Sequence, residues 1–312
     1  MKNKFVKLVS SFTGLFIVLL IFTIAAPDVF LSFYNLKTVA IQTTVVGITA
    51  LGMTLIMISG GIDLSVGSIV AVSTVIIALL LNLNINPLFA SICGIIAGGL
   101  IGLVNGLIIT RFRIVPFIVT LGMLGIVRGA AKGIAGSQKI DAPMTALTEL
   151  LTKSPNPPWI VLPAGVWIMF ILAAAISILL YRTVIGRYIF AVGSNEETAR
   201  LCGIKINGVK LFVYIFSGMC TGLAGLMEFS RLTVGDPTVS MGLELDVIAA
   251  VVIGGGSLSG GEGSVLGTII GAFMMAFLRN GCNLTGIPNF VQEIIIGTII
   301  IIAVAIDRIH NK

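Results

Sequence analysis

The chain has 312 residues, of which 57% are apolar and only 10% are charged, and its mean hydropathy is +1.12. These values exclude an ordinary water-soluble globular protein and indicate an integral membrane protein. The formal net charge of +6 is spread over separate polar segments and forms no continuous basic stripe, so we expect no nucleic-acid partner.

Apolar runs long enough to cross a bilayer recur along the whole chain. We place ten predicted spans at 8–26, 38–58, 64–83, 88–110, 114–130, 160–181, 211–230, 245–256, 264–280 and 290–306. The first begins like a cleavable signal peptide, but further spans follow, which favours an uncleaved helix. The sequence therefore predicts an all-α polytopic membrane protein, one transmembrane domain over 1–312 with about ten helices, some of them short or broken.

The distribution of basic residues predicts the orientation, because Lys and Arg in short loops resist translocation. With the N-terminus inside, the cytoplasmic basic residues are Lys2, Lys4, Lys7, Arg111, Arg113, Arg182, Arg187, Arg200, Lys205, Lys210, Arg308 and Lys312. Both termini are then cytoplasmic. The proline-rich loop over about 137–158 is periplasmic, with one short helix expected around 146–151, and the loop over about 182–210 is cytoplasmic.

Glycines spaced four residues apart mark surfaces where helices can pack closely. They are Gly94, Gly98, Gly102 and Gly106 in the fourth span, with the pairs Gly218 and Gly222, and Gly267 and Gly271, further on. We interpret them as packing residues. Glycine-rich segments at 58–65 and 253–259 also resemble each other, an arrangement typical of transporters with interrupted helices.

The segment 258–262 reads LSGGE, one residue away from the LSGGQ signature of ABC ATPases. A nucleotide-binding domain also needs a phosphate loop of the form G-x-x-x-x-G-K-S/T, which the sequence lacks. We therefore interpret this segment as a glycine-rich turn. Any energy from ATP must come from another chain.

Polar residues at membrane depth are costly and so mark candidate functional or structural positions. Asp63 and Asp246 precede or begin predicted spans, where an N-cap role would explain each. Glu228 and Arg231, three apart on one helix, are expected to neutralise each other. His310 is the only histidine and the four cysteines lie far apart, so the sequence predicts no catalytic residue and no metal site.

Several strings together resemble the permease subunit of ribose-type ABC importers, the family that also carries galactose, xylose and arabinose. They are ALGMTL at 50–55, SGGIDLSVGS at 59–68, PFIVTLG at 116–122, GRYIFAVGSNEETARL at 186–201 with Gly203 and Ile204, and ELDVIAAVVIGG at 244–255. The resemblance covers nearly the whole chain. Cys202 departs from the pattern, because family members often have Ser there.

The resemblance implies a multi-pass protein of the bacterial cytoplasmic (inner) membrane that works with other proteins and with lipid. The implied protein partners are a second copy of the chain or a close paralogue, a periplasmic or lipid-anchored sugar-binding protein, and a cytoplasmic ATPase with two fused nucleotide-binding halves. That ATPase would bind ATP and Mg²⁺, so no cofactor is expected on this chain.

The resemblance and the residue chemistry together give three sets of candidate site residues. The ATPase-coupling set is Gly193, Asn195, Glu196, Glu197, Ala199, Arg200, Gly203 and Ile204. The structural or gating set is Gly60, Gly61, Asp63, Ser65, Gly67, Glu244 and Asp246. The expected substrate path is Asn105, Asn280, Asn283, Gln292 and Glu293, mainly neutral amides able to bind sugar hydroxyls.

The expected function is translocation of a monosaccharide, with ribose favoured, by alternating access driven by the separate ATPase. The permease itself would break no bond. Two other classes are an ion-coupled secondary sugar transporter, which needs ionisable groups in mid-membrane, and an intramembrane hydrolase, which needs a Ser-His or paired-Asp arrangement. The sequence does not identify the sugar.

Overall fold

A computed structural model describes residues 2–152 and 161–310. Within them the helices are α1 (Lys2–Ala25), α2 (Phe33–Ile58), α3 (Val66–Asn82), α4 (Pro87–Phe112), α5 (Pro116–Ile134), α6 (Ala164–Arg182), α7 (Val184–Ser194), α8 (Glu196–Leu201), α9 (Ile206–Leu232), α10 (Leu243–Ile253), α11 (Val265–Leu284) and α12 (Asn289–His310). A 3-10 helix, η1 (Ala146–Glu149), and two short strands, β1 (Ile140–Asp141) and β2 (Val234–Gly235), complete the elements. The strands pair antiparallel, with Ile140 opposite Gly235.

The helical architecture agrees with the all-α prediction, since each of the ten predicted spans overlaps a helix. Six helices are long and apolar enough to cross a membrane, namely α2, α4, α5, α6, α9 and α11. Helix α10 has 11 residues, as short as expected. Helices α7 and α8 lie within the loop predicted over 182–210, and η1 falls where a short helix was expected. Residues 153–158 of the predicted periplasmic loop, and Lys312, lie outside the described residues.

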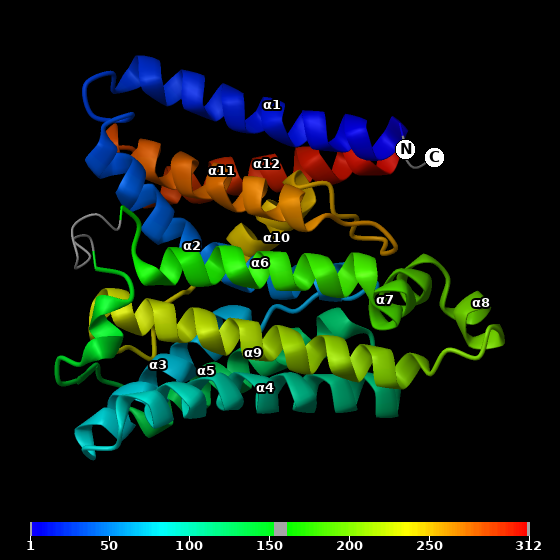
Figure 1. The fold of residues 1–312 in the computed structure, drawn as a ribbon, viewed down its shortest axis with the longest axis horizontal. Helices are drawn as coiled ribbons and strands as arrows, with labels where there is room; N and C mark the ends of the chain where they lie inside the picture. The colour runs from blue at the N-terminus through cyan, green and yellow to red at the C-terminus, as the bar shows by residue number, and fades with distance from the viewer. Residues whose placement is uncertain (1, 153–160, 311–312) are drawn as a thin grey trace.

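Helices α4 and α9 pack closely side by side through their glycines (Figure 1). A Cβ added at Gly98 would overlap the carbonyl oxygen of Gly218, and one at Gly102 would overlap the carbonyl oxygen of Tyr214. Gly271 has the same relation to the backbone of Ala250 in α10. The packing role of these glycines is confirmed, because no side chain separates the two backbones at these points.

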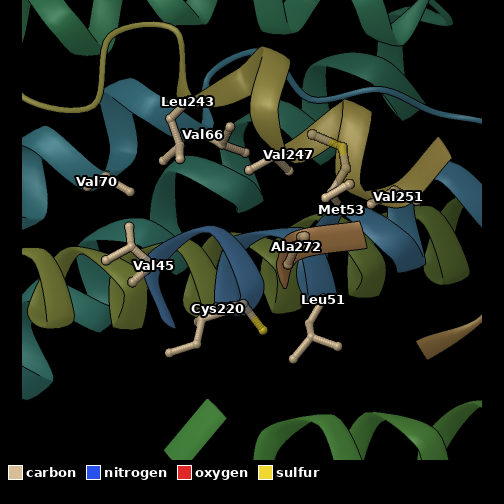
Figure 2. Packing of buried hydrophobic residues seen from close by; sticks show 14 of the residues in the cluster. Val45, Leu51, Met53, Val66, Val70, Cys220, Leu243, Val247, Val251 and Ala272 are labelled. Atoms are coloured by element: carbon tan, nitrogen blue, oxygen red, sulfur yellow. The ribbon is translucent and has the colours of Figure 1, made fainter. Parts of the chain in front are cut away.

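The apolar core lies where α2, α3, α9, α10 and α11 meet. Figure 2 shows Leu51 and Met53 of α2 among side chains from these helices. Leu51, Met53 and Val247 are fully buried. Because α2 is surrounded by other helices, it presents little of its length to lipid.

Two connections enter the molecule as turns and irregular chain rather than as helix. Residues 59–65 join α2 to α3, and residues 236–242 lead from β2 to α10. The beginnings of α3 and α10 lie close together, since a Cβ added at Gly67 would meet the backbone of Ser240 and the carboxylate of Glu244. Interrupted backbone of this kind is tolerated in membrane proteins where other protein segments surround it.

The N-cap roles predicted for Asp63 and Asp246 are wrong. Helix α3 begins after Ser65, and Asp63 instead accepts hydrogen bonds from the Ser65 backbone and hydroxyl, closing a local turn. The N-cap of α10 is Gly242, and Asp246 lies inside the first turn, where it binds an arginine of α11. In both cases a side-chain partner outweighs the capping preference of aspartate.

The beginning of α1 and the end of α12 lie at the same end of the molecule as α7 and α8 (Figure 1). The loop between α5 and α6 lies at the opposite end. This arrangement agrees with both termini and the segment 182–210 sharing one side. That this side is cytoplasmic stays a prediction from the basic residues.

Candidate functional site

Gly193 near the end of α7 meets two other glycine-rich segments, the start of the 59–65 connection and the turn between α10 and α11. The Gly261 amide donates a hydrogen bond of 2.9 Å to the Ile58 carbonyl oxygen. A Cβ added at Gly193 of α7 would overlap that same oxygen and lie 2.7 Å from the Gly261 nitrogen. Gly60 and Gly260 have φ of +82° and +85°, a conformation that favours glycine. We call this contact of 58–61, 193 and 260–261 the glycine junction.

The glycine junction gives the two similar sequence segments a physical role. The segments 58–65 and 253–259 were matched only by their glycines, and their neighbouring residues are in direct backbone contact. The LSGGE string lies in the turn between α10 and α11, as predicted. Gly193, from the predicted coupling segment, completes the contact, so a displacement of α7 would act directly on the 59–65 connection and on the turn between α10 and α11.

The predicted coupling residues lie together around α8, which projects from the end of the molecule (Figure 1). Asn195 caps α8, its Oδ1 accepting a hydrogen bond of 2.8 Å from the Thr198 amide. Glu196 binds Lys210 of α9 at 2.6 Å and lies 3.5 Å from Arg200. Ala199 is buried beneath the helix, whereas Glu197 is exposed.

The segment that follows α8 turns back into α9. Gly203 has φ of +81° with open space around its Cα, so a side chain there would be strained by the backbone alone. Ile204 lines a cavity of about 590 Å³ together with Glu196, Arg200 and Lys205. Lys210, which anchors α8 through Glu196, was not among the predicted coupling residues, because its spacing in the sequence does not reveal that contact.

The residues expected to form one substrate path do not lie together. Asn280 and Asn35 exchange two hydrogen bonds of 2.9 Å, both buried between α11 and α2. Gln292 donates to Asn283 at 2.8 Å and to the Ile287 carbonyl at 2.9 Å. Glu293 is exposed, and Asn105 lies in a separate cluster described below. Most of these amides therefore hold helices and turns in place.

The Asn35–Asn280 pair permits a test of that structural role. We expect Asn280→Leu to lower the free energy of unfolding by about 1–3 kcal/mol, because it leaves the buried Asn35 amide without this partner. The double variant Asn35→Leu/Asn280→Leu should recover part of the loss, since both polar groups are then removed. Thermal unfolding in detergent measures both. Equal melting temperatures for the wild type and Asn280→Leu would contradict the assignment.

A buried polar cluster surrounds the predicted motif residues Asp63 and Ser65. Asn105 of α4 donates to the Ser65 hydroxyl at 3.0 Å, and Asp63, Ser65 and Asn105 are each fully buried. The Tyr214 hydroxyl of α9 lies against Gly61. Among the described residues, Asp63 Oδ2, Asn105 Oδ1 and the Tyr214 hydroxyl have no hydrogen-bond partner. The cluster fixes the 59–65 connection against α4.

Arg128 of α5 holds the second connection. Its Nη1 donates to the carbonyl oxygens of Pro237 and Val239, at 3.0 and 2.7 Å. Glu244, at the start of α10, lies nearby against Gly67. Nothing in the sequence spacing of Arg128 indicated these partners.

Asp236 stabilises the beginning of the same connection, directly after β2. It accepts hydrogen bonds from the Thr238 amide and hydroxyl, and Lys139 lies 3.3 Å away. Burial raises the pKa of Asp236, but the Thr238 hydrogen bonds and the Lys139 charge outweigh burial, so the pKa is held below its ordinary value. The carboxylate therefore stays ionised near neutral pH.

Two further ion pairs each join a buried carboxylate to a partly exposed arginine. Glu228 and Arg231 bind each other within α9, which confirms the predicted neutralisation. Asp246 accepts two hydrogen bonds, of 2.7 and 2.8 Å, from Arg279 of α11. Sequence reasoning missed Arg279, because a pairing between α10 and α11 depends on how the chain folds back. The side chains in these pairs are charge-balanced within the described structure.

Comparison with known proteins agrees with the resemblance found in the sequence. A family model described as the permease component of the branched-chain amino acid transport system matches residues 35–304. The ribose import permease protein of Escherichia coli is 38% identical over 298 residues, covering 96% of this chain and 92% of that protein. Its counterpart in Bacillus subtilis is 39% identical, covering 95% and 91%.

Permeases named for other sugars match as well. The L-arabinose ABC transporter permease protein of Azospirillum brasilense is 35% identical over 290 residues, covering 93% of this chain and 84% of that protein. The D-allose transport system permease protein of Escherichia coli is 33% identical, covering 97% and 92%. No solved structure matches. With its apolar helices and this near-complete coverage, the chain is a multi-pass membrane protein that belongs to the family of transport-system permease components.

Proposed function

We propose that this chain is the membrane-spanning permease of an ATP-binding-cassette importer that carries a monosaccharide into the cell, with ribose as the favoured sugar. The observation that carries the proposal is the match, over more than nine-tenths of the chain, to permeases named for ribose import. Relatives named for arabinose and allose support a small sugar as the substrate class. In this proposal the chain lies in the bacterial inner membrane, with its termini cytoplasmic.

The proposed importer has three further parts. A second copy of the chain completes the pore, a sugar-binding protein delivers the substrate from outside, and an ATPase with two nucleotide-binding halves supplies energy from the cytoplasm. The permease alternates between outward-open and inward-open states and does no chemistry itself. Projection of α8 from one end of the molecule supports that end as the docking surface for the ATPase (Figure 1).

The proposed path of coupling runs from α8 through α7 to the glycine junction. A push on α8 is transmitted to Lys210 of α9 by the Glu196 ion pair, and to the 59–65 connection by Gly193. The 59–65 connection leads into α3, whose beginning lies beside the beginning of α10 inside the bundle. Changes at the ATPase would in this way reach the middle of the membrane.

Reconstitution into liposomes tests the function. We expect D-ribose uptake only when the permease, the ATPase, the sugar-binding protein and ATP are all present. Removal of transmembrane ion gradients should leave uptake unchanged. Sugar accumulation driven by an ion gradient, without the ATPase or the binding protein, would instead establish a secondary transporter.

Charge reversal on α8 tests the coupling surface. We expect Arg200→Glu to leave the permease folded and ATP hydrolysis active, but to reduce sugar uptake by about tenfold or more. The variant places a second carboxylate one turn from Glu196 and removes a cation from the exposed surface. Arg182→Glu, an equal charge change at the exposed end of α6, is the control and should transport normally. Normal uptake per ATP hydrolysed in Arg200→Glu would remove α8 from the coupling path.

A further inference from the structure

Four acidic side chains are buried among the described residues, and three of them bind a basic side chain. The three ion pairs are Lys139 with Asp236, Arg231 with Glu228 and Arg279 with Asp246. Asp63 is the fourth, and no Lys or Arg within the described ranges forms an ion pair with it. An unpaired charge in a protein interior is strongly unfavourable, so the carboxyl group of Asp63 must be neutralised in another way.

Asp63 lies in the 59–65 connection and is enclosed by α4, α5 and α9. Asn105 of α4 contacts it through Ser65, and Tyr214 of α9 lies close enough to interact with it electrostatically. On the α5 side, Thr120 donates a hydrogen bond of 3.2 Å to the carbonyl oxygen of residue 62. Tyr214 is the titratable side chain that faces Asp63, whereas Asn105 and Thr120 are neutral. These neighbours supply polar groups but no positive charge.

The hydrogen bonds of this cluster leave two acceptors without donors. Asn105 Nδ2 donates to the Ser65 hydroxyl at 3.0 Å, and that hydroxyl donates to Asp63 Oδ1. Asp63 Oδ2 and Asn105 Oδ1 are buried, and neither accepts a hydrogen bond from any described residue. The Tyr214 hydroxyl is also unpartnered and has a single proton to donate. With Asp63 ionised, the cluster therefore has more acceptors than donors placed to reach them.

A proton on Asp63 Oδ2 removes both deficits at once. It cancels the unpaired charge, and it turns Oδ2 from an acceptor into a donor, because a protonated carboxyl group has one O–H. Oδ1 can still accept from the Ser65 amide and hydroxyl. A metal ion would also neutralise the carboxylate, but it needs room for itself and several ligands around one point. The proton needs no additional room in a cluster whose members are almost fully buried.

We propose that Asp63 is a neutral, protonated carboxylic acid in the folded permease, and that its O–H hydrogen-bonds to the neighbouring oxygen of Asn105 or Tyr214. The bound proton then holds the 59–65 connection against the surrounding helices. The predicted gating set thus contains two aspartates of opposite character, a neutral Asp63 and an ionised Asp246 that binds Arg279. The proposal does not depend on which substrate crosses the membrane.

Isosteric variants test the charge state through stability. Asp63→Asn keeps an acceptor for Ser65 and replaces the O–H with an N–H donor, so its melting temperature in detergent should match that of the wild type within about 2 °C. Asp246→Asn makes the same chemical change at an ionised residue. It leaves Arg279 without its carboxylate and should lower the melting temperature by roughly 3 °C or more. A loss in Asp63→Asn as large as that in Asp246→Asn would overturn the neutral state.

Infrared spectroscopy detects the proton directly, and it does so on the wild type even if Asp63→Asn does not fold. A protonated carboxyl group has a C=O stretch that is separate from the bands of ionised carboxylates and of the backbone. At neutral pH, wild-type permease should show such a band, and carbon-13 labelling of the aspartate side-chain carboxyls should shift it. The band should persist in Asp246→Asn and disappear in Asp63→Asn. If no protonated carboxyl band responds to the label, the proposal is overturned.

Salt replacement separates a bound proton from a bound metal ion. The melting temperature of the wild type should be the same in Na⁺, K⁺ and choline buffers of equal ionic strength. Stabilisation by Na⁺ or K⁺ that is lost in Asp63→Asn and kept in Asp246→Asn would overturn the proton and assign a monovalent cation to Asp63. None of these measurements involves sugar uptake, so the proposed function is tested separately.

Discussion

Gly98→Leu is expected to prevent the permease from accumulating as a folded, monodisperse protein. Its side chain would have to occupy the position of the Gly218 carbonyl and the Gly222 backbone on α9. Overpacking a core costs about 1–3 kcal/mol where side chains can adjust. Here the obstacle is backbone, so α4 and α9 must separate along their length, at a cost on the order of the total stability of a domain, about 5–15 kcal/mol. Size-exclusion profiles and thermal unfolding in detergent measure the loss.

The control for this variant is Gly129→Leu in α5. Gly129 is also helical, but a Cβ there would meet nothing within 4 Å. It should therefore yield normal amounts of folded protein. If Gly98→Leu matched Gly129→Leu in yield and melting temperature, direct backbone packing between α4 and α9 would be wrong.

Gly193→Ala is expected to abolish sugar uptake or reduce it by more than about tenfold. Alanine normally stabilises a helix relative to glycine by roughly 1 kcal/mol, and Gly193 lies within α7. At this position the added methyl group would overlap the Ile58 carbonyl and crowd the Gly261 amide. We therefore expect alanine to be unfavourable here, because opening the glycine junction breaks the contact of α7 with the 59–65 connection and with the turn between α10 and α11. Uptake and ATP hydrolysis by the reconstituted importer measure the effect.

Gly208→Ala tests whether position alone explains that result. Gly208 lies in the first turn of α9, on the same side of the molecule, and the nearest atom to an added Cβ is 4.0 Å away. This variant should transport normally and be slightly more stable than the wild type. Equal uptake by Gly193→Ala and Gly208→Ala would remove the glycine junction from the proposed mechanism.

Periodic features of the sequence predicted the fold well. Apolar runs located the helices because a bilayer imposes a minimum length on any span. The four-residue glycine spacing in α4 predicted a packing surface, since those residues share one helix face. The sequence did not reveal that α9 is the partner along that whole surface, because pairing between helices depends on the complete arrangement.

The candidate site was predicted less completely, for a different physical reason. The residues 193–204 are adjacent in the chain, so the predicted coupling residues necessarily lie together around α8, and their coupling role stays a prediction. Substrate-path residues were chosen one by one for their amide chemistry. Asn280 pairs with Asn35, a residue 245 positions away in the chain, and no local pattern predicts such a contact. Arg279 was overlooked for the same reason, although it adjoins Asn280.

The backbone contact between α4 and α9 also limits how the bundle can move during transport. Helices separated by long side chains can slide past one another while those side chains change rotamer. Between Gly98 and Gly218, and between Gly102 and Tyr214, there is no such layer to deform. Any shear would drive peptide groups into one another, so the pair moves as one rigid body. We therefore expect the changes in shape during transport to occur where the chain is not helical, at 59–65 and 236–242, while α4 and α9 move together as one unit.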